Sequence, residues 1–202
     1  MLAALVALAI AVSVMTIPAK KPQRQLEMIW PTQMWNAKVQ VSLTPGYELR
    51  VFQSGDEEQF FRLMGLAGFE GWNRETLKPW LLKILPDGWF VIVHTESSEL
   101  VATTMATHNP TEEHPFGGEL GWVAAHPQYL GKGLGLATCA AVTDRFLRAG
   151  YRHIYLKTDD FRLPAIKTYF KLGYTPSLHV DGEDHTARWK TVCEKLHWPL
   201  GS

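Results

Sequence analysis

The sequence predicts an α/β protein with a mixed central sheet, helices on both faces and a C-terminal helix. Two observations predict this class. The strand-like stretches 89–94 and 100–107 follow each other closely, which favours an antiparallel hairpin. Further along, a strand at 120–125, a helix at 134–149 and a strand at 153–158 give a β-α-β order, which is typical of a parallel strand pair.

The composition excludes several classes of protein. The chain has 202 residues, 46% hydrophobic and 20% charged, which fits one folded domain with a tail and excludes a disordered, collagen-like or polytopic membrane protein. Basic and acidic residues both number 20, so we expect no nucleic-acid partner. Two cysteines, Cys139 and Cys193, argue against a disulfide scaffold or a cysteine-rich zinc site.

The chain divides at residue 47. Residues 1–46 are interpreted as an N-terminal apolar segment with a linker, because 18–46 show no clear periodicity. Residues 47–202 are interpreted as the folded domain.

The first 17 residues are almost entirely apolar. Three interpretations stay open: a membrane anchor, a signal peptide, or an over-long start with Met15 or Met28 as the true start. The nearest basic residues follow the run: Lys20, Lys21 and Arg24. Positive charge on that side keeps the body cytoplasmic, so we expect a cytoplasmic protein, with membrane contact through 1–17 if the anchor interpretation holds.

The first elements of the body are justified by their periodicity. Residues 47–52 alternate as a strand does, and Ser54 with Glu57 forms a capping-box pattern before a helix. Apolar residues at helical spacing predict a second helix over 73–85, which contains Pro79. The sequence 86–88, Pro-Asp-Gly, predicts a turn before the hairpin.

The last elements follow the β-α-β unit. Residues 108–118 form a loop, and Gly150 suits the end of the helix at 134–149. Pro164 suits the first turn of a helix that Gly173 ends, and a strand over 174–180 follows. Residues 185–197 have helical spacing.

A glycine-rich turn at 128–135 is the most informative segment. Gly131, Gly133 and Gly135 alternate directly before a helix, and such backbone can present N–H groups to an anion such as phosphate. An ordinary β-α turn is the alternative. The P-loop and dinucleotide patterns are both absent.

The turn reads Q-x-x-G-x-G, from Gln128 through Gly131 to Gly133. With this motif, residues 47–180 resemble the GCN5-related N-acetyltransferase (GNAT) superfamily. A second motif, N-x-x-A-x-x-x-Y-x-K-x-G-F, is matched downstream. Its matching residues are Ala165, Tyr169, Lys171 and Gly173, with Tyr174 in place of Phe.

The resemblance implies that acetyl-CoA binds as co-substrate between the strands at 120–125 and 153–158. The implied cofactor contacts are Val123, Ala124 and Ala125 for pantetheine, and the amides of Gly131, Lys132, Gly133, Leu134, Gly135 and Leu136 for pyrophosphate. The Lys132 side chain either adds charge near the phosphates or is solvated. Arg162 replaces the family's Asn, which puts that contact in doubt, although an Arg can reach the 3′-phosphate.

The resemblance also implies direct attack of an amine on the thioester, with a backbone N–H near Val123 polarising the carbonyl. Tyr169 occupies the position of the acid that protonates the leaving thiolate, and packing on the sheet is its alternative. Glu119 is the candidate base, with a solvated strand end as its alternative. We expect no metal, because the histidines and carboxylates at 179–185 have no persuasive spacing.

The sequence therefore predicts a GNAT-type N-acetyltransferase, a transferase that moves an acetyl group from acetyl-CoA to an amine, with a small molecule favoured over a protein as acceptor. A non-catalytic CoA-binding or sensory module is one alternative. A membrane-tethered acyltransferase using a longer acyl-CoA is another. Trp189 lies on one face of the C-terminal helix; this face either covers the sheet edge, covers the acceptor side, or forms a homodimer contact.

Overall fold

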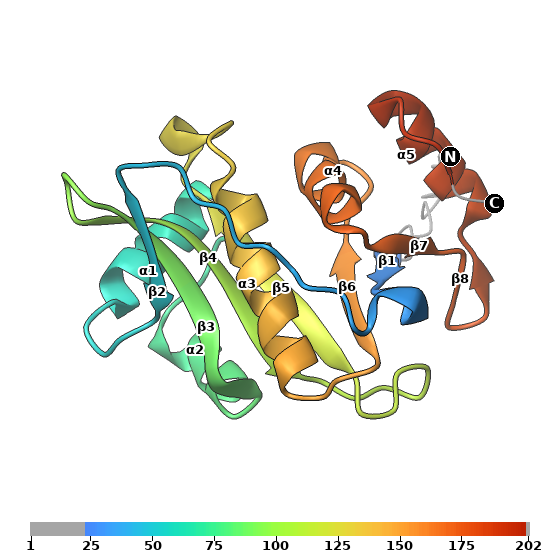
Figure 1. Ribbon diagram of the computed structural model, residues 1–202, viewed down its shortest axis with the longest axis horizontal. Coiled ribbons are helices and arrows are strands. Elements are labelled where there is room, and N and C mark those ends of the chain that lie inside the picture. The colour runs from blue at the N-terminus through green and yellow to red at the C-terminus, as the bar shows by residue number, and fades with distance from the viewer. Residues whose placement is uncertain (1–22, 201–202) are drawn as a thin grey trace, which may run out of the picture.

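The computed structural model describes residues 23–200, and Figure 1 shows them built around one twisted sheet. Within these residues the sheet has seven strands in the order β2-β3-β4-β5-β6-β1-β7, and a second sheet pairs β8 with β9. The strands are β1 (Leu26–Ile29), β2 (Tyr47–Val51), β3 (Ile84–His94), β4 (Glu99–His108), β5 (Gly118–Ala125), β6 (Ile154–Thr158), β7 (Thr175–Ser177), β8 (His179–Val180) and β9 (Glu183–Asp184). The helices are α1 (Glu57–Leu66), α2 (Arg74–Leu81), α3 (Leu134–Arg148), α4 (Leu163–Leu172) and α5 (Thr186–Leu196), with two short 3₁₀ helices at Thr32–Met34 and Pro127–Tyr129.

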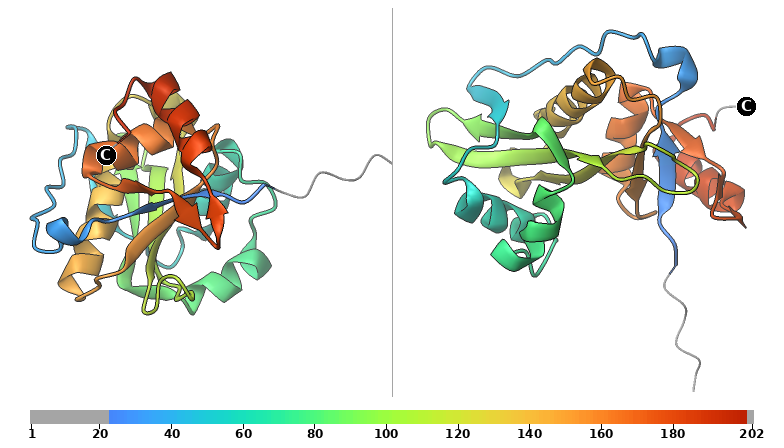
Figure 2. Two further views of the ribbon diagram at one scale, coloured as in Figure 1. Left: turned by 90° about the vertical axis from the view of Figure 1, so that its right-hand side faces the viewer. Right: turned by 90° about the horizontal axis from the view of Figure 1, so that it is seen from below.

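Helices cover both faces of the sheet (Figure 2). Phe60 and Leu63 of α1 and Leu77 of α2 pack with Trp89 of β3 on one face. On the opposite face, buried side chains of α3 and α4 share a core with β5, β6 and β1. The pairing of β5 with β6 is parallel, whereas the other pairings in this sheet are antiparallel. The predicted α/β class with a mixed sheet and a C-terminal helix is confirmed.

Strand β1 corrects the interpretation of residues 18–46 as a linker. It lies inside the sheet and pairs antiparallel with β6 on one side and β7 on the other. Leu26 and Met28 are fully buried among residues of α3, α4 and β6. Four residues are too few to show a period, and the partners of β1 lie more than 120 positions away, so the sequence pattern did not reveal it. For the other residues of 1–46, the interpretation as an apolar segment with a linker stays a prediction.

Helix α1 begins without the predicted capping box. Its N-cap is Asp56, whose side chain makes no capping hydrogen bond. Instead, both Asp56 carboxylate oxygens accept hydrogen bonds from the Arg50 guanidinium, at 2.6 and 2.8 Å. This ion pair holds the pKa of Asp56 below its usual value even though burial acts to raise it. The start of the helix is therefore fastened to β2 rather than capped locally.

The predicted helix over 73–85 is shorter than expected. A capping box between Asn73 and Thr76 starts α2, but the helix ends at Leu81. Residues 86–88 lie inside β3, in an irregular stretch between Ile84 and Trp89 where Asp87 has a φ of 53°. The predicted turn is therefore a distortion within a strand.

The C-terminal helix α5 packs on α4 within the same chain. Trp189 is fully buried, lies 6.1 Å from the Phe170 ring, and donates its indole N–H to the carbonyl of Ser177. The Trp189 side chain therefore covers its own domain and is not available for a homodimer contact. Between residues 23 and 200, every helix is too short or too polar to cross a bilayer. The apolar run 1–17 lies outside the described residues.

Candidate acetyl-transfer site

The central feature of the site is a parallel strand pair that separates after two residues. Gly118 and Glu119 of β5 pair with Ile154 and Tyr155 of β6, and in the described chain this ladder goes no further. On its other edge, β6 is paired with β1 along Tyr155–Thr158. Since the two strands are held together only at their N-terminal ends, they diverge toward the end where the glycine-rich turn lies.

A bulge in β5 accompanies this separation. Between the pairs Met105–Gly121 and Thr103–Ala124, β5 advances three residues while β4 advances two. The extra residue falls at 122–123, and Trp122 has a φ of 54°. A left-handed conformation is an outlier for a bulky residue, and bulges redirect backbone groups next to functional sites. Here the redirected peptide groups are those around Val123, on the strand that borders the opening.

The glycine-rich turn leads directly into α3. Gly131 and Gly133 have φ values of 79° and 76°, and Gly133 is the N-cap of the helix. A Cβ atom added at Gly131, Gly133 or Gly135 would meet no protein atom within 4 Å. The backbone amides at the positive end of the helix are thus bordered by open space, an arrangement that suits an anion such as phosphate.

Tyr169 lies on α4 in the core shared with α3, and 5% of its surface is exposed. Burial raises the pKa of Tyr169 well above its usual value, with a further increase from Cys139, so the phenol keeps its proton at neutral pH. Among residues 23–200 its hydroxyl makes no hydrogen bond, but its oxygen is not fully enclosed by protein atoms. The hydroxyl therefore keeps some contact with solvent. Its role as an acid stays a prediction.

Glu119 lies on the sheet face that also carries α1 and α2, within a polar network. Its Oε2 accepts a hydrogen bond of 2.6 Å from the Asn109 side-chain amide. Asn109 in turn accepts one from Lys83 Nζ at 2.9 Å, and its backbone carbonyl accepts one from the Tyr155 hydroxyl at 2.7 Å. Burial raises the pKa of Glu119, and the Asn109 hydrogen bond opposes that rise. The side chain is thus a positioned carboxyl group, although its role as base stays a prediction.

The Arg162 side chain contacts two neighbouring residues. Its Nε donates to Asp159 at 3.1 Å, and its guanidinium lies 4.4 Å from the centre of the Phe69 ring. Phe69 belongs to the connection between α1 and α2, so Arg162 links that connection to the start of α4. Lys132 is exposed, and its carbonyl accepts a hydrogen bond from Thr44. The roles of Arg162 and Lys132 as CoA contacts stay predictions.

Cys139 is a core residue. It is fully buried on α3, and burial raises the pKa of its thiol to about 12. A thiol that keeps its proton is not a nucleophile at neutral pH.

Sequence reasoning missed three residues that surround Glu119. Lys83 follows α2, Asn109 begins the loop after β4, and Tyr155 lies on β6. None belongs to a motif. The predicted β-α-β order, which places the strand at 153–158 beside the strand at 120–125, was the one sequence signal for Tyr155 as a neighbour.

Comparison with solved structures shows the fold. The chain is similar to a GCN5-related N-acetyltransferase from Sphaerobacter thermophilus, with 20% identity and a TM-score of 0.55, covering 77% of this chain and 50% of that one. A GCN5-related N-acetyltransferase from Kribbella flavida gives 20% identity and a TM-score of 0.51, covering 77% and 55%. An acetyltransferase from Trypanosoma brucei gives 21% identity and a TM-score of 0.53, covering 68% and 99%. The chain thus spans about half the length of the first two.

Sequence comparison adds the family. Among curated proteins, none matches this chain. A family model described as the acetyltransferase (GNAT) family matches residues 56–174, from the N-cap of α1 to the second residue after α4, and so includes the opening, the glycine-rich turn and Tyr169. Because this match covers more than half of the sequence, the chain belongs to the acetyltransferase (GNAT) family.

Proposed function

We propose that this chain transfers an acetyl group from acetyl-CoA to an amine by direct attack in a ternary complex. The observation that carries the proposal is the separation of β5 from β6 beside the glycine-rich turn. A strand whose edge is unpaired can bind an extended ligand through its backbone groups. The adjacent helix start can bind that ligand's phosphates. Pantetheine joined to pyrophosphate has this combination of groups.

In this proposal the backbone of Val123, Ala124 and Ala125 binds pantetheine, and the amides of residues 131–136 bind pyrophosphate. The left-handed glycines and the open space beside them support the second assignment. A structural neighbour, the NatC complex, has been solved bound to a Gag peptide and CoA, with 19% identity to this chain and a TM-score of 0.51.

The reaction requires a deprotonated amine, a stabilised oxyanion and a protonated leaving group. Glu119 takes the proton of the attacking amine, directly or through a water molecule. The N–C bond forms while the backbone N–H near Val123 stabilises the oxyanion, and the C–S bond then breaks. Tyr169 gives its proton to the departing thiolate and regains one from solvent. A raised pKa of Glu119 suits a base, because it brings the carboxyl closer to neutral pH.

We infer that the acceptor is a small molecule. The Trp122 ring at the bulge is in contact with Trp72 at 4.6 Å and Trp80 at 4.8 Å, measured between ring centres. These rings come from the α1–α2 connection and from α2, and Asn109 borders Glu119 from the loop after β4. Crowding on this side favours a compact amine over a protein surface.

The proposal is tested by calorimetry with acetyl-CoA, followed by thiol-release assays over a panel of amines. We expect binding and turnover of at least one amine. Binding with no turnover across the panel would favour the CoA-binding module, and no binding at millimolar acetyl-CoA would reject both functions.

The assignment of the amides of residues 131–136 to pyrophosphate is tested with Gly133→Asp. A side chain at this position places bulk and a negative charge against the pyrophosphate, so we expect acetyl-CoA binding to be lost. The matched control is Gly150→Asp, at the opposite end of α3, where φ is 81° and a Cβ atom likewise meets nothing within 4 Å. Both variants carry the same left-handed strain, on the order of 1–2 kcal/mol. Equal acetyl-CoA binding by the two variants would reject the assignment of residues 131–136 to pyrophosphate.

A further inference from the structure

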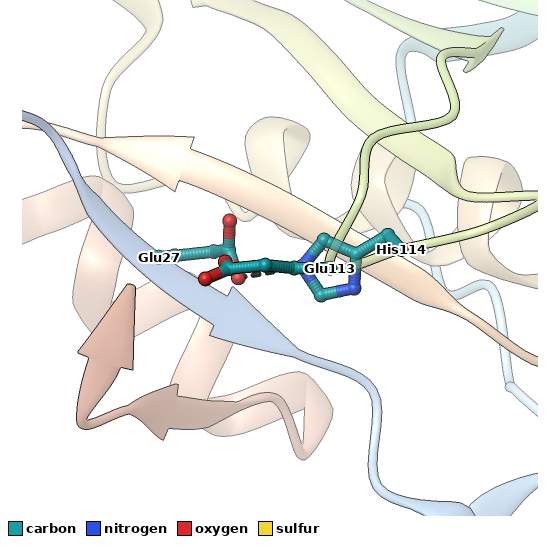
Figure 3. A group of neighbouring side chains, drawn as sticks. All are labelled: Glu27, Glu113 and His114. Atoms are coloured by element: carbon teal, nitrogen blue, oxygen red, sulfur yellow. Dashed lines mark hydrogen bonds and ion pairs between the residues drawn. The ribbon is translucent and has the colours of Figure 1, made fainter. Parts of the chain in front are cut away.

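Two carboxylates and an imidazole converge where the N-terminal strand meets the loop between β4 and β5 (Figure 3). Glu27 comes from β1, and Glu113 and His114 come from the loop. His114 Nε2 lies 2.6 Å from Glu27 Oε1, and one ligand atom from each of the three side chains lies within 4.8 Å of the others. This cluster was not visible in the sequence, because 87 positions separate Glu27 from His114.

Each of the three side chains is also constrained by residues outside the cluster. Glu27 is 2% exposed and alternates with the buried Leu26 and Met28 along β1. The His114 ring stacks on the Tyr155 ring, with centres 4.3 Å apart and planes 12° apart. Glu113 accepts a hydrogen bond from the backbone N–H of Asp181. A ligand set that is already ordered loses little entropy when an ion binds.

The charges around the cluster favour a cation. Glu27 is buried, and among the described residues the partner of its side chain is His114, with no lysine or arginine within ion-pair distance. Asp181, which contacts Glu113, shares Arg24 with Glu183. Lys157 stands opposite Glu27 in the β1–β6 ladder, with an exposed side chain. Carboxylates therefore outnumber basic groups, and a buried carboxylate without a full countercharge is costly.

We propose that Glu27, Glu113 and His114 form a binding site for a divalent transition-metal ion of the zinc class. One imidazole and two carboxylates are ligands that Zn²⁺ accepts, and they leave a coordination position for water. Zinc ligands lie roughly 2.0–2.2 Å from the ion. His114 Nε2 and Glu27 Oε1 therefore move apart slightly, and any proton between them leaves to solvent. The bound ion would join β1 to the loop that covers the Glu119 face of the sheet.

This proposal does not depend on acetyl transfer, so its test measures the metal alone. The full chain, stripped with a chelator and dialysed, is titrated with Zn²⁺ by calorimetry and followed by thermal unfolding. We expect binding of one ion with a rise in Tm, and much weaker binding of Mg²⁺, which prefers an all-oxygen octahedral site. Equal affinity for the two ions would overturn the role assigned to His114.

Two variants locate the ion. Glu113→Gln changes an exposed side chain, so the fold is retained, and we expect Zn²⁺ affinity to fall by at least about 100-fold, the upper end of what the loss of an outer-shell partner costs. The matched control is Glu112→Gln, at the adjacent exposed position, which should bind as the unmodified chain does. His114→Gln should abolish binding. If Glu113→Gln and His114→Gln both bind Zn²⁺ with unchanged affinity, the ion lies elsewhere and the proposal is wrong.

Discussion

At the scale of the residue, Tyr169 illustrates how burial shapes a candidate acid. Its raised pKa keeps the phenol protonated but also makes it a weaker acid. We therefore expect Tyr169→Phe to lower kcat by about 100-fold, the lower end of what general acids contribute, with little change in acetyl-CoA affinity. Steady-state kinetics and calorimetry measure the two quantities separately.

Tyr174 provides the control for this substitution. Its ring lies 6.4 Å from that of Tyr169, and its hydroxyl is 3.0 Å from the Thr143 hydroxyl in the core. Tyr174→Phe should cost about 1 kcal/mol of unfolding free energy through the lost hydrogen bond and leave kcat unchanged. Equal losses of kcat in the two variants would show that Tyr169 acts by packing alone.

Glu119 gives a prediction for pH dependence. Burial raises its pKa, whereas the Asn109 hydrogen bond lowers it. A base works only when deprotonated, so kcat/KM should fall as pH decreases through the raised pKa. Asn109→Ala removes the opposing hydrogen bond, raises the pKa further and should move this acidic limb to higher pH. The measurement is a pH profile of kcat/KM, with Glu119→Gln as the variant in which the limb disappears. If the acidic limb of the Asn109→Ala profile does not move, a group other than Glu119 produces that limb.

At this scale, the site residues that the sequence could reveal are those that lie close together in the chain. The glycines at 131–135 and Tyr169 were found because each belongs to a compact motif. Asn109, Lys83 and Tyr155 surround Glu119 from three separate segments, and only the folded sheet brings them together. The bulge at Trp122 was equally hidden, because its left-handed backbone is imposed by pairing with β4 and not by a glycine.

At the scale of the element, local pattern predicted most strands and helices. The hairpin, α3 and α5 each have a clear period and a recognisable end. Strand β1 has neither, because it is short and its register is set by β6 and β7. Helix α2 ends early since its chain must turn into β3 at Ile84. These differences arise where tertiary pairing, not local preference, decides the structure.

Strand β1 carries a stability prediction. A chain that starts at residue 23 keeps every described contact, whereas one that starts at residue 31 lacks Leu26 and Met28, both fully buried. Burying two such side chains contributes roughly 3–6 kcal/mol, a large part of the stability of a typical domain. We expect the second chain to unfold at a much lower urea midpoint than the first.

A single substitution covers the case in which the shorter chain does not fold. Leu26→Ala should cost about 2–5 kcal/mol, while Val41→Ala, at a 40% exposed position between β1 and β2, should change stability by less than about 0.5 kcal/mol. Similar urea midpoints for these two variants would show that β1 contributes little.

At the scale of the whole molecule, the sheet consists of two parts with a narrow junction. Strands β2 to β5 form one part, β6, β1 and β7 form the other, and two residue pairs join them. The parts are also linked by packing of α3 against α4 and by the segment between β1 and β2, which runs past α3 in Figure 1. The proposed acetyl-CoA site lies across this junction, so its ligand would contact both parts.

Acetyl-CoA should therefore stabilise the molecule as a unit. A ligand at about 100 times its Kd adds about 2.7 kcal/mol to the unfolding free energy, which corresponds to a rise in Tm of about 5–10 °C for a chain of this size. Differential scanning fluorimetry at increasing acetyl-CoA measures it. Gly133→Asp should show no rise, whereas Gly150→Asp should show the full rise from a lowered starting Tm. A Tm in the unmodified chain that does not respond to millimolar acetyl-CoA would mean that the junction between β5 and β6 is not the cofactor site.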